Sequence, residues 1–328
     1  MQNLIRIGIV GYGNLGRGVE TSIQKNPDLT LVGIFSRRDP ATVKPCFEDT
    51  QVYRMENLDD FQDKIDVLIL CGGSKDDLPK QTPELASKFN TVDSFDTHAR
   101  IPEFFDAVDA PAMANKKTAM ISIGWDPGMF SLNRLFGEAL LPDGETYTFW
   151  GKGLSQGHSD AIRRVEGVKA GVQYTIPSTD AIEKVRSGVR PVLSTKEKHT
   201  RECYVVLEAG ADAEAVKQSI VTMPDYFADY DTTVNFIDEA TLAAEHNTMP
   251  HGGFVIRSGN SSAEQNQVIE FALKLDSNPE FTASVLVAYA RATYRLNQMG
   301  QYGAKTAFDV APGLLSMKSA AQLRKELL

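Results

Sequence analysis

Three glycines near the start of the chain, Gly11, Gly13 and Gly16, have the G-x-G-x-x-G spacing that can hold the pyrophosphate of a dinucleotide. Gly11 permits a tight turn, Gly13 lets the backbone approach the phosphates, and Gly16 lets a helix pack closely on a strand. The unpaired N–H groups of that helix would then face the phosphates. The alternative is an incidental glycine-rich turn, which the expected strand before the loop and helix after it disfavour. The predicted cofactor-binding loop comprises Gly11, Tyr12, Gly13, Asn14, Leu15 and Gly16.

The end of the next expected strand indicates which dinucleotide binds. That strand, residues 29–35, is followed by Ser36, Arg37 and Arg38, and no carboxylate comes before Asp39. NAD-binding folds usually place Asp or Glu there, about 20 residues beyond the glycines, to bind the ribose 2′-hydroxyl. Guanidinium forks suit a 2′-phosphate instead. We therefore predict NADP, the alternative being two solvated surface arginines.

A further loop is predicted to pack against the cofactor through Cys71, Gly72 and Ser74, which follow a buried strand at residues 66–71. Open α/β sheets bind ligands at the carboxyl ends of their strands. Cys71 could instead be a nucleophile, but no base lies near it in the sequence, and buried cysteines are commonly inert.

Four clusters of polar and aromatic residues also follow expected strands, at residues 91–98, 124–129, 149–160 and 249–253. Each cluster alone is typical of a turn, because Gly, Asp and Pro favour turns. Asp126-Pro127 could simply begin a helix, with Pro at the first helical position. Four clusters together, two of them with a tryptophan, favour a substrate site.

Strands and helices alternate in the first part of the chain. We expect strands at residues 4–10, 29–35, 66–71, 91–92 and 117–123, and helices at 14–25, 84–89 and 102–115. This alternation predicts an α/β fold, a Rossmann-like doubly wound parallel sheet covered on both faces. We assign residues 1–125 and 304–328 to this NADP-binding domain, with the tail packing back on it.

Beyond residue 125 the expected strands are longer and alternate more clearly, at residues 146–150, 170–176, 200–208, 232–238, 252–258 and 267–275. Helices are expected at 178–187, 212–221 and 281–298. This pattern predicts a second, α+β domain over residues 126–303, with a mixed or antiparallel sheet that has one face against helices.

Composition excludes several classes of protein. A length of 328 residues suits two domains, and a net charge of −9 disfavours nucleic-acid binding. There is no apolar run long enough for a membrane span and no signal peptide. Three widely spaced cysteines fit reduced cytoplasmic thiols. No histidine spacing matches a metal motif, so we predict no metal, and we expect His98 and His199 to be surface or locally bonded residues.

The chain resembles the meso-diaminopimelate D-dehydrogenase family in segments from residue 8 to about residue 285. The most specific segments are GWDPGMFS (124–131) and WGKGLSQGHSDA (150–161), and others are VDSFDTHARIP, MPHGG and LKLDSNPEFTAS. The resemblance implies oxidation of the D-centre of meso-2,6-diaminopimelate by NADP, giving L-2-amino-6-oxopimelate and ammonia. It also implies the reverse reductive amination in lysine biosynthesis, and a homodimer whose second domain binds substrate and dimerises.

The resemblance also assigns roles to residues. Asp96 and Asp126 match acidic residues that face the reacting amino group, with Trp125 beside them, and either aspartate could be the base. Matches to an aromatic wall are Phe149 and Trp150, and matches to groups that bind the distal L-centre are Thr175, Arg201, His251 and Asn278.

Two other functions remain open at this point. One is an NADP oxidoreductase of the same architecture acting on another amino or hydroxy acid, as in homoserine- or saccharopine-type dehydrogenases, which GWDPGMFS and WGKGLSQGHSDA disfavour. The other is a non-catalytic NADP-binding sensor or scaffold, which the polar groups at the strand ends disfavour.

Overall fold

The computed structural model describes residues 4–328, and the chain forms two compact units. Unit 1 contains residues 4–132 and 279–328, and unit 2 contains residues 133–278. The chain leaves unit 1 within α4 (Met129–Leu140) and re-enters it at the start of α10 (Asn278–Gln298). No helix in the described part of the chain is both long enough and apolar enough to cross a membrane.

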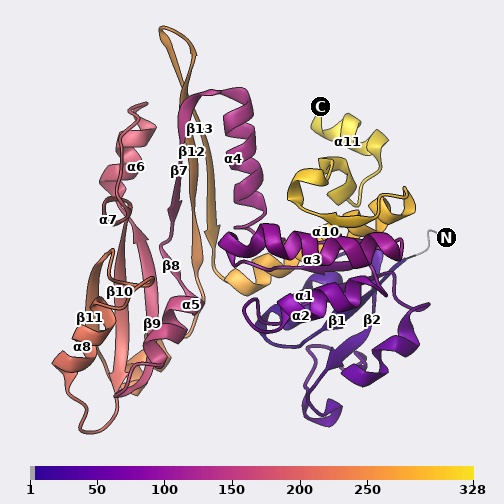
Figure 1. Ribbon diagram of the computed structural model, residues 1–328, viewed down its shortest axis with the longest axis horizontal. Helices are drawn as coiled ribbons and strands as arrows, with labels where there is room; N and C mark the ends of the chain where they lie inside the picture. The colour runs from indigo at the N-terminus through magenta and orange to yellow at the C-terminus, as the bar shows by residue number, and fades with distance from the viewer. Residues whose placement is uncertain (1–3) are drawn as a thin grey trace. The chain divides into compact units, whose positions relative to one another are not determined.

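Unit 1 is built on a seven-stranded sheet in which all neighbouring strands are parallel (Figure 1). The strand order is β14-β6-β5-β4-β1-β2-β3. The strands are β1 (Ile5–Val10), β2 (Leu29–Ser36), β3 (Val52–Arg54), β4 (Val67–Leu70), β5 (Thr91–Asp93), β6 (Thr118–Met120) and β14 (Gly303–Lys305). This order is that of a doubly wound dinucleotide-binding sheet, so the predicted fold class is confirmed.

Helices cover both faces of this sheet. On one face, α1 (Asn14–Ile23) and α10 contribute Val19 and Leu286 to a core that contains Ile7. On the other face, α2 (Leu78–Ala86) and α3 (Ile101–Ala114) pack on Leu68 and its neighbours. Because both faces are buried, the strands are almost continuously apolar, as in the VLIL of β4. The remaining helix is α11 (Ala320–Leu327), and short 3-10 turns lie at Pro40–Thr42, Met55–Phe61, His98–Arg100, Ala307–Asp309 and Pro312–Leu315.

The long helix α10 lies in unit 1, whereas the sequence assigned residues up to 303 to the second domain. Its buried face, which includes Leu286 and Ala290, joins the core under β1. Arg291, only 2% exposed, donates to both carboxylate oxygens of Asp28 and to the carbonyl of Leu315. The compact units therefore differ from the predicted boundaries at residues 126–132 and 279–303, because packing rather than chain order defines them.

Unit 2 contains two sheets, where the sequence predicted one mixed or antiparallel sheet. A mixed sheet has the order β11-β10-β9-β8, and an antiparallel sheet has the order β13-β12-β7. Alternation in the sequence indicates which side chains face a core, but it does not say which strands pair. The strands are β7 (Asp143–Trp150), β8 (Gly153–Leu154), β9 (Val168–Pro177), β10 (His199–Leu207), β11 (Asp231–Phe236), β12 (His251–Ser262) and β13 (Gln265–Leu275).

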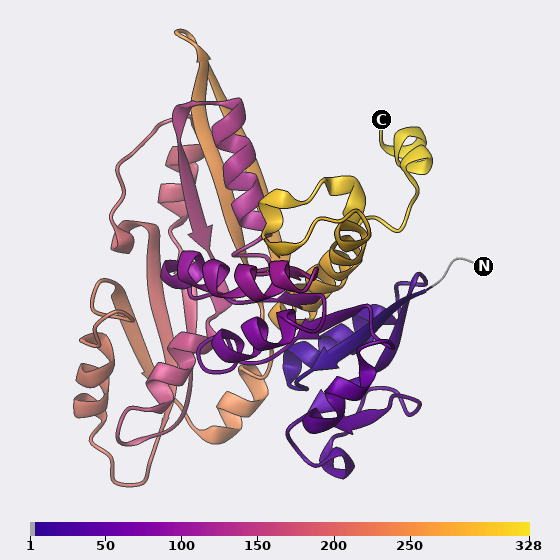
Figure 2. The same ribbon diagram turned by 45° about the vertical axis from the view of Figure 1, so that its right-hand side comes forward.

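Short helices pack on each sheet of unit 2. Helices α5 (Gln156–Arg163) and α8 (Ala213–Val221) cover the mixed sheet. Helix α6 (Thr179–Arg186) covers the antiparallel sheet, whose β12–β13 hairpin is drawn in orange in Figure 2. The other helices are α7 (Thr195–Lys198) and α9 (Glu239–Glu245). The sequence analysis did not predict α5, α7 or α9, all of which are short. Around α5, turn-forming Gly and Ser favoured a loop.

Candidate functional site

The glycine loop has the geometry that its spacing predicts. Gly11 has φ +86, which favours glycine, and a Cβ on Gly16 would lie 2.5 Å from the carbonyl oxygen of Gly11. A Cβ on Gly13 would meet nothing within 4 Å, so space lies open in front of the residue that precedes α1. A phosphate can therefore approach the backbone here, at the positive end of the helix dipole.

Two arginines follow the end of β2, and the guanidinium of one of them contacts this loop. Arg38 Nη2 donates to the carbonyl of Tyr12, and the N–H of Arg38 donates to Ser36 Oγ over 3.0 Å. Arg37 pairs with Asp77 at 2.8 Å, and both arginines are exposed. The structure thus brings Ser36, Arg37 and Arg38 together beside the glycine loop, an arrangement that suits a bound phosphate.

A buried carboxylate that sequence reasoning missed supports the same loop. Glu20 of α1 is fully buried and accepts the Tyr12 hydroxyl and the N–H groups of Cys46 (2.8 Å) and Phe47 (3.3 Å). Burial raises the pKa of Glu20, but hydrogen bonds from Thr50, Tyr12 and the two amides outweigh it and lower the pKa overall. Its position beside Val19, on the buried face of α1, is the signal that could have found it, since an acid there must have partners.

The loop after β4 connects the glycine loop to the next loop of the sheet. The N–H of Cys71 donates to the carbonyl of Val10 over 2.8 Å, and Ser74 Oγ accepts the N–H of Asp96 over 2.9 Å. Burial raises the pKa of the Cys71 thiol, which therefore stays protonated and unreactive at neutral pH. The arrangement favours packing rather than nucleophilic chemistry for this cysteine.

Asp96 and Asp126 lie on loops that follow the adjacent strands β5 and β6. Asp96 is exposed and Asp126 is half-buried. Trp125 is 8% exposed and packs edge-on against Phe130, with ring centroids 5.2 Å apart. Helix α4 begins at Met129, so Asp126-Pro127 precedes the helix rather than forming its first turn. The two carboxylates therefore come from neighbouring loops at one edge of the sheet.

In unit 2, Thr175 and Arg201 are directly paired across β9 and β10. Arg201 is 7% exposed, donates through Nη1 to Thr175 Oγ1, and stacks over the ring of Tyr230 at 3.9 Å. Burial lowers the pKa of this guanidinium. Its Nε has no hydrogen-bond partner, and no carboxylate of the described chain forms an ion pair with it. An anion is the ligand that such a buried cation favours.

His251 belongs to the same group of residues. Gly153 of β8 pairs with Thr175, and a Cβ on Gly153 would lie 2.4 Å from the His251 ring, so the imidazole packs directly over this strand. The His251 Nδ1 accepts the N–H of Gly252 over 2.8 Å. The N–H of Asn278 donates to the carbonyl of Met249, two residues before His251. The structure thus gathers Thr175, Arg201 and His251, with Asn278 tied to the same loop.

The two residues of the predicted aromatic wall differ in exposure. Phe149 is fully buried in the core between the antiparallel sheet and α6, so we assign it to packing rather than to ligand contact. Trp150 is 36% exposed and stacks on His199, with ring centroids 5.4 Å apart. His199 Nε2 accepts the N–H of Trp150 over 2.8 Å, which makes this histidine a locally bonded residue.

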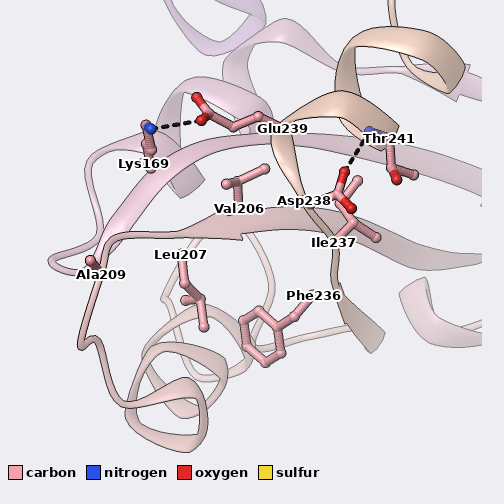
Figure 3. Close-up of a pocket in the computed structure, with 9 residues that line it drawn as sticks. All are labelled: Lys169, Val206, Leu207, Ala209, Phe236, Ile237, Asp238, Glu239 and Thr241. Carbon is pink, nitrogen blue, oxygen red and sulfur yellow. Dashed lines mark hydrogen bonds and ion pairs between the residues drawn. The ribbon is translucent and has the colours of Figure 1, made fainter.

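A cleft of about 720 Å³ also lies in unit 2, but it contains none of these residues (Figure 3). Charged groups that line this cleft already have partners within the protein. Lys169 pairs with Glu239 at 2.7 Å, and Asp238 accepts the N–H of Thr241 over 2.7 Å. We therefore attach no function to this cleft. No cluster of three or more metal-ligating side chains occurs between residues 4 and 328.

The fold and the loops at its edge define unit 1 as a Rossmann-like dinucleotide-binding domain, a class widespread among oxidoreductases. A family described as the diaminopimelic acid dehydrogenase C-terminal domain matches residues 124–277. Meso-diaminopimelate D-dehydrogenases from Lysinibacillus sphaericus and Corynebacterium glutamicum are 66% and 50% identical to the chain. These matches cover 99% of both chains for the first, and 97% of this chain and 98% of the relative for the second.

Solved structures agree with these relatives. The C. glutamicum DAP dehydrogenase in complex with DAP is 49% identical and superposes with a TM-score of 0.93 over 100% of both chains. An engineered D-amino acid dehydrogenase bound to NADP+ is 48% identical, with a TM-score of 0.88 over 99% of this chain and 100% of that one. The chain belongs to the meso-diaminopimelate D-dehydrogenase family, which confirms the resemblance seen in the sequence.

We expect His199 to make the stability of the protein sensitive to acid. Burial, together with the charges of Arg201 and Lys198, lowers its pKa from 6.5 to about 4. The neutral imidazole therefore stabilises the fold above pH 6.5, and this stability is lost as the pH falls towards 4. In His199→Gln the amide oxygen can still accept the Trp150 N–H but does not titrate. Urea unfolding at a series of pH values should show a shallower decline for His199→Gln than for the wild type.

The exposed His98 provides a matched control, because His98→Gln should keep the wild-type decline. Equal pH dependence of the free energy of unfolding in the wild type and His199→Gln would contradict the assignment.

Proposed function

We propose that this protein is an NADP-dependent meso-diaminopimelate dehydrogenase, an oxidoreductase acting on a CH–NH₂ group. With NADP+ and water it oxidatively deaminates the D-centre of meso-2,6-diaminopimelate to L-2-amino-6-oxopimelate, ammonia and NADPH, the water supplying the new carbonyl oxygen by hydrolysis of the imine. It also catalyses the reverse reductive amination in lysine biosynthesis. The observation that carries the proposal is the 66% identity to a named enzyme of this activity over 99% of both chains.

The loops at the edge of the unit 1 sheet fit the cofactor. The open space at Gly13 suits the pyrophosphate, and the exposed guanidinium groups of Arg37 and Arg38 suit the 2′-phosphate. The other predicted cofactor contacts are Ser36, Cys71, Gly72 and Ser74. When bound, NADP+ accepts the hydride that leaves the D-centre carbon.

Asp96 and Asp126 serve the amino group of the D-centre. An ammonium nitrogen has no lone pair with which to form the imine, so the amine must lose a proton before the carbon is oxidised. A carboxylate of this pair takes that proton, directly or through water. Asp96 and Asp126 lie on loops that follow adjacent strands, which supports a shared role at the amino group. The buried Trp125, next to Asp126 in the sequence, limits access of solvent to the reacting carbon.

The residues of unit 2 bind the opposite, L-configured end of the substrate. Arg201 supports this role because it is a buried cation without an anionic partner, and Thr175 and His251 lie beside it. Asn278 and the exposed face of Trp150 complete the group. Holding the L-centre leaves a nearly symmetric substrate with one productive orientation, which accounts for selectivity towards the D-centre. A non-catalytic scaffold is disfavoured, because a buried guanidinium without an anionic partner destabilises a fold unless it binds a ligand.

The proposal includes a homodimer with the second domain as its dimerisation region, a cytoplasmic location, and no nucleic-acid partner. These follow from the family resemblance and from the acidic net charge of −9.

The direct test is the rate of NADPH formation by the purified protein with NADP+ and each stereoisomer of diaminopimelate. We expect rapid turnover of the meso isomer, because it alone presents a D-centre for reaction and an L-centre for binding. The LL isomer, which has no D-centre, and the DD isomer, which has no L-centre, are the controls. Equal rates with the LL and meso isomers would refute selectivity for the D-centre.

We expect Asp96→Asn and Asp126→Asn each to lower kcat, by about a hundredfold for the residue that acts as the base. An amide keeps the size of the carboxylate but cannot accept a proton. NADP affinity, measured by fluorescence titration, should change little because both residues lie outside the glycine loop. Asp106→Asn, an exposed carboxylate of α3, is the control and should keep full activity. Near wild-type rates in both variants across the pH range would disprove the assignment.

Arg38→Ala should weaken NADP binding about tenfold to a hundredfold, the loss expected for a hydrogen bond between charged groups. Binding of NAD should change much less, because NAD lacks the 2′-phosphate. Calorimetric titration with each dinucleotide measures both affinities. Arg324→Ala removes the same charge from an exposed position on α11 and should leave both unchanged. A parallel loss of NAD and NADP affinity in Arg38→Ala would show that the residue does not read the 2′-phosphate.

A further inference from the structure

Asp93, the last residue of β5, is a buried carboxylate that none of the preceding roles uses. Its exposed fraction is 0%, and no lysine or arginine of residues 4–328 pairs with it. Taking an ionisable group out of water without a counter-ion is costly unless hydrogen bonds compensate for the lost hydration. Burial raises the pKa of Asp93 more than its hydrogen bonds lower it, and the net pKa is about 6.

The hydrogen bonds of Asp93 connect two separate loops. Its Oδ1 accepts the N–H of Phe95 and the N–H of Ser122, both over 3.0 Å, and its Oδ2 accepts the Thr82 hydroxyl over 2.9 Å. Phe95 directly precedes Asp96 in the loop after β5. Ser122 lies in the segment that follows β6 and leads to Trp125 and Asp126. One carboxylate oxygen therefore joins the two loops that carry the candidate catalytic pair.

The Ser122 end of this bridge depends on Asp93. Ser122 has φ +57, a left-handed conformation that a non-glycine residue adopts only when its surroundings impose it. The residue is buried, so its N–H has no water to bond if Asp93 is absent. A neighbouring backbone bond, from the Ile123 N–H to the Asp93 carbonyl over 2.9 Å, continues the sheet but does not reach Ser122. The Asp93 carboxylate is the acceptor of the Ser122 N–H, so this turn depends on it.

We propose that Asp93 is a positioning residue that sets the spacing of Asp96 and Asp126 by bridging the Phe95 and Ser122 amides. The inference rests on the proposed roles of the two aspartates in proton transfer. A carboxylate oxygen has the lone pairs to accept both amides at once, and an ionised acceptor forms the stronger bonds. Rigid placement matters because a misplacement of about 1 Å in a reacting pair can cost a hundredfold in rate.

Two substitutions of Asp93 distinguish its bond to Ser122 from its local bond to Phe95. Asp93→Asn keeps an oxygen that can accept both amides, and its NH₂ group can donate to Thr82. Asp93→Ser keeps only a short hydroxyl, which can accept the Phe95 N–H in a turn of the same type but cannot span to Ser122. The control is Asp66→Ala, which removes a carboxylate bonded to Arg6 just before β4, at the opposite edge of the sheet.

We expect Asp93→Ser to lower kcat with meso-diaminopimelate by about tenfold to a hundredfold, while the KM for NADP stays within about threefold of the wild type. Asp93→Asn should keep kcat within about fivefold, because the bridge remains. Asp66→Ala should lower thermal stability without this loss of kcat. Wild-type kcat in Asp93→Ser, or equal losses in Asp93→Ser and Asp66→Ala, overturns the inference.

A second readout is independent of activity. The chain has two tryptophans, so a Trp150→Phe background leaves Trp125 as a single reporter on the segment that follows β6. Asp93→Ser should raise the acrylamide quenching constant of Trp125 at least about twofold, because the loop is released locally, and Asp93→Asn and Asp66→Ala should not. Unchanged quenching in Asp93→Ser overturns the bridge. If the wild type did not turn over meso-diaminopimelate, the proposed function would fail, and quenching would still decide the bridge.

If Asp93→Ser does not fold, hydrogen exchange on the wild-type protein gives the answer. The Phe95 and Ser122 amides should then exchange as slowly as amides within β5. Exchange of the Ser122 amide at the rate of exposed loop amides overturns the inference.

Discussion

Parallel pairing of β1 with both β2 and β4 determines where unit 1 can hold a ligand. Every strand of a parallel sheet ends at the same edge, so loops that are far apart in the sequence converge there. In this protein the converging loops are also bonded to one another in the order of the sheet. The bonds join Arg38 to Tyr12, Cys71 to Val10, Ser74 to Asp96, and Asp93 to Ser122. The edge is thus one connected surface from the end of β2 to the end of β6.

Three buried charges, those of Glu20, Asp93 and Arg201, differ in how they are compensated. Glu20 and Asp93 are fully buried carboxylates, yet each is surrounded by N–H and O–H donors of its own unit. Arg201 is a buried cation whose Nε has no partner. The carboxylates are therefore complete without a ligand and act by holding backbone in place. The Arg201 guanidinium lacks a partner for its Nε, as expected of a group that binds an anionic ligand.

The sequence predicted the parts of the molecule that depend on local chemistry. Glycine spacing, the Ser36-Arg37-Arg38 segment and five strands of the unit 1 sheet lie where they were expected, because short-range sterics and periodicity decide them. The short edge strands β3 and β14 were not predicted. The roles of the two buried carboxylates escaped prediction because each also bonds residues distant in sequence, as Asp93 bonds Ser122, 29 residues away. The division of unit 2 into two sheets, the burial of Phe149 and the packing of α10 on unit 1 likewise depend on tertiary pairing.

The position of α10 and β14 has a consequence for how the protein is made. Both elements belong to unit 1, β14 as a strand of its sheet and α10 as a helix packed on it, but they are encoded after unit 2. On the ribosome, the face of the sheet that α10 covers is therefore exposed while residues 133–278 are synthesised. Unit 2 is continuous in the chain and has its own cores, so it can form first. Completion of the N-terminal domain thus waits for the C-terminal segment, and the nascent chain must keep an apolar surface from aggregating until then.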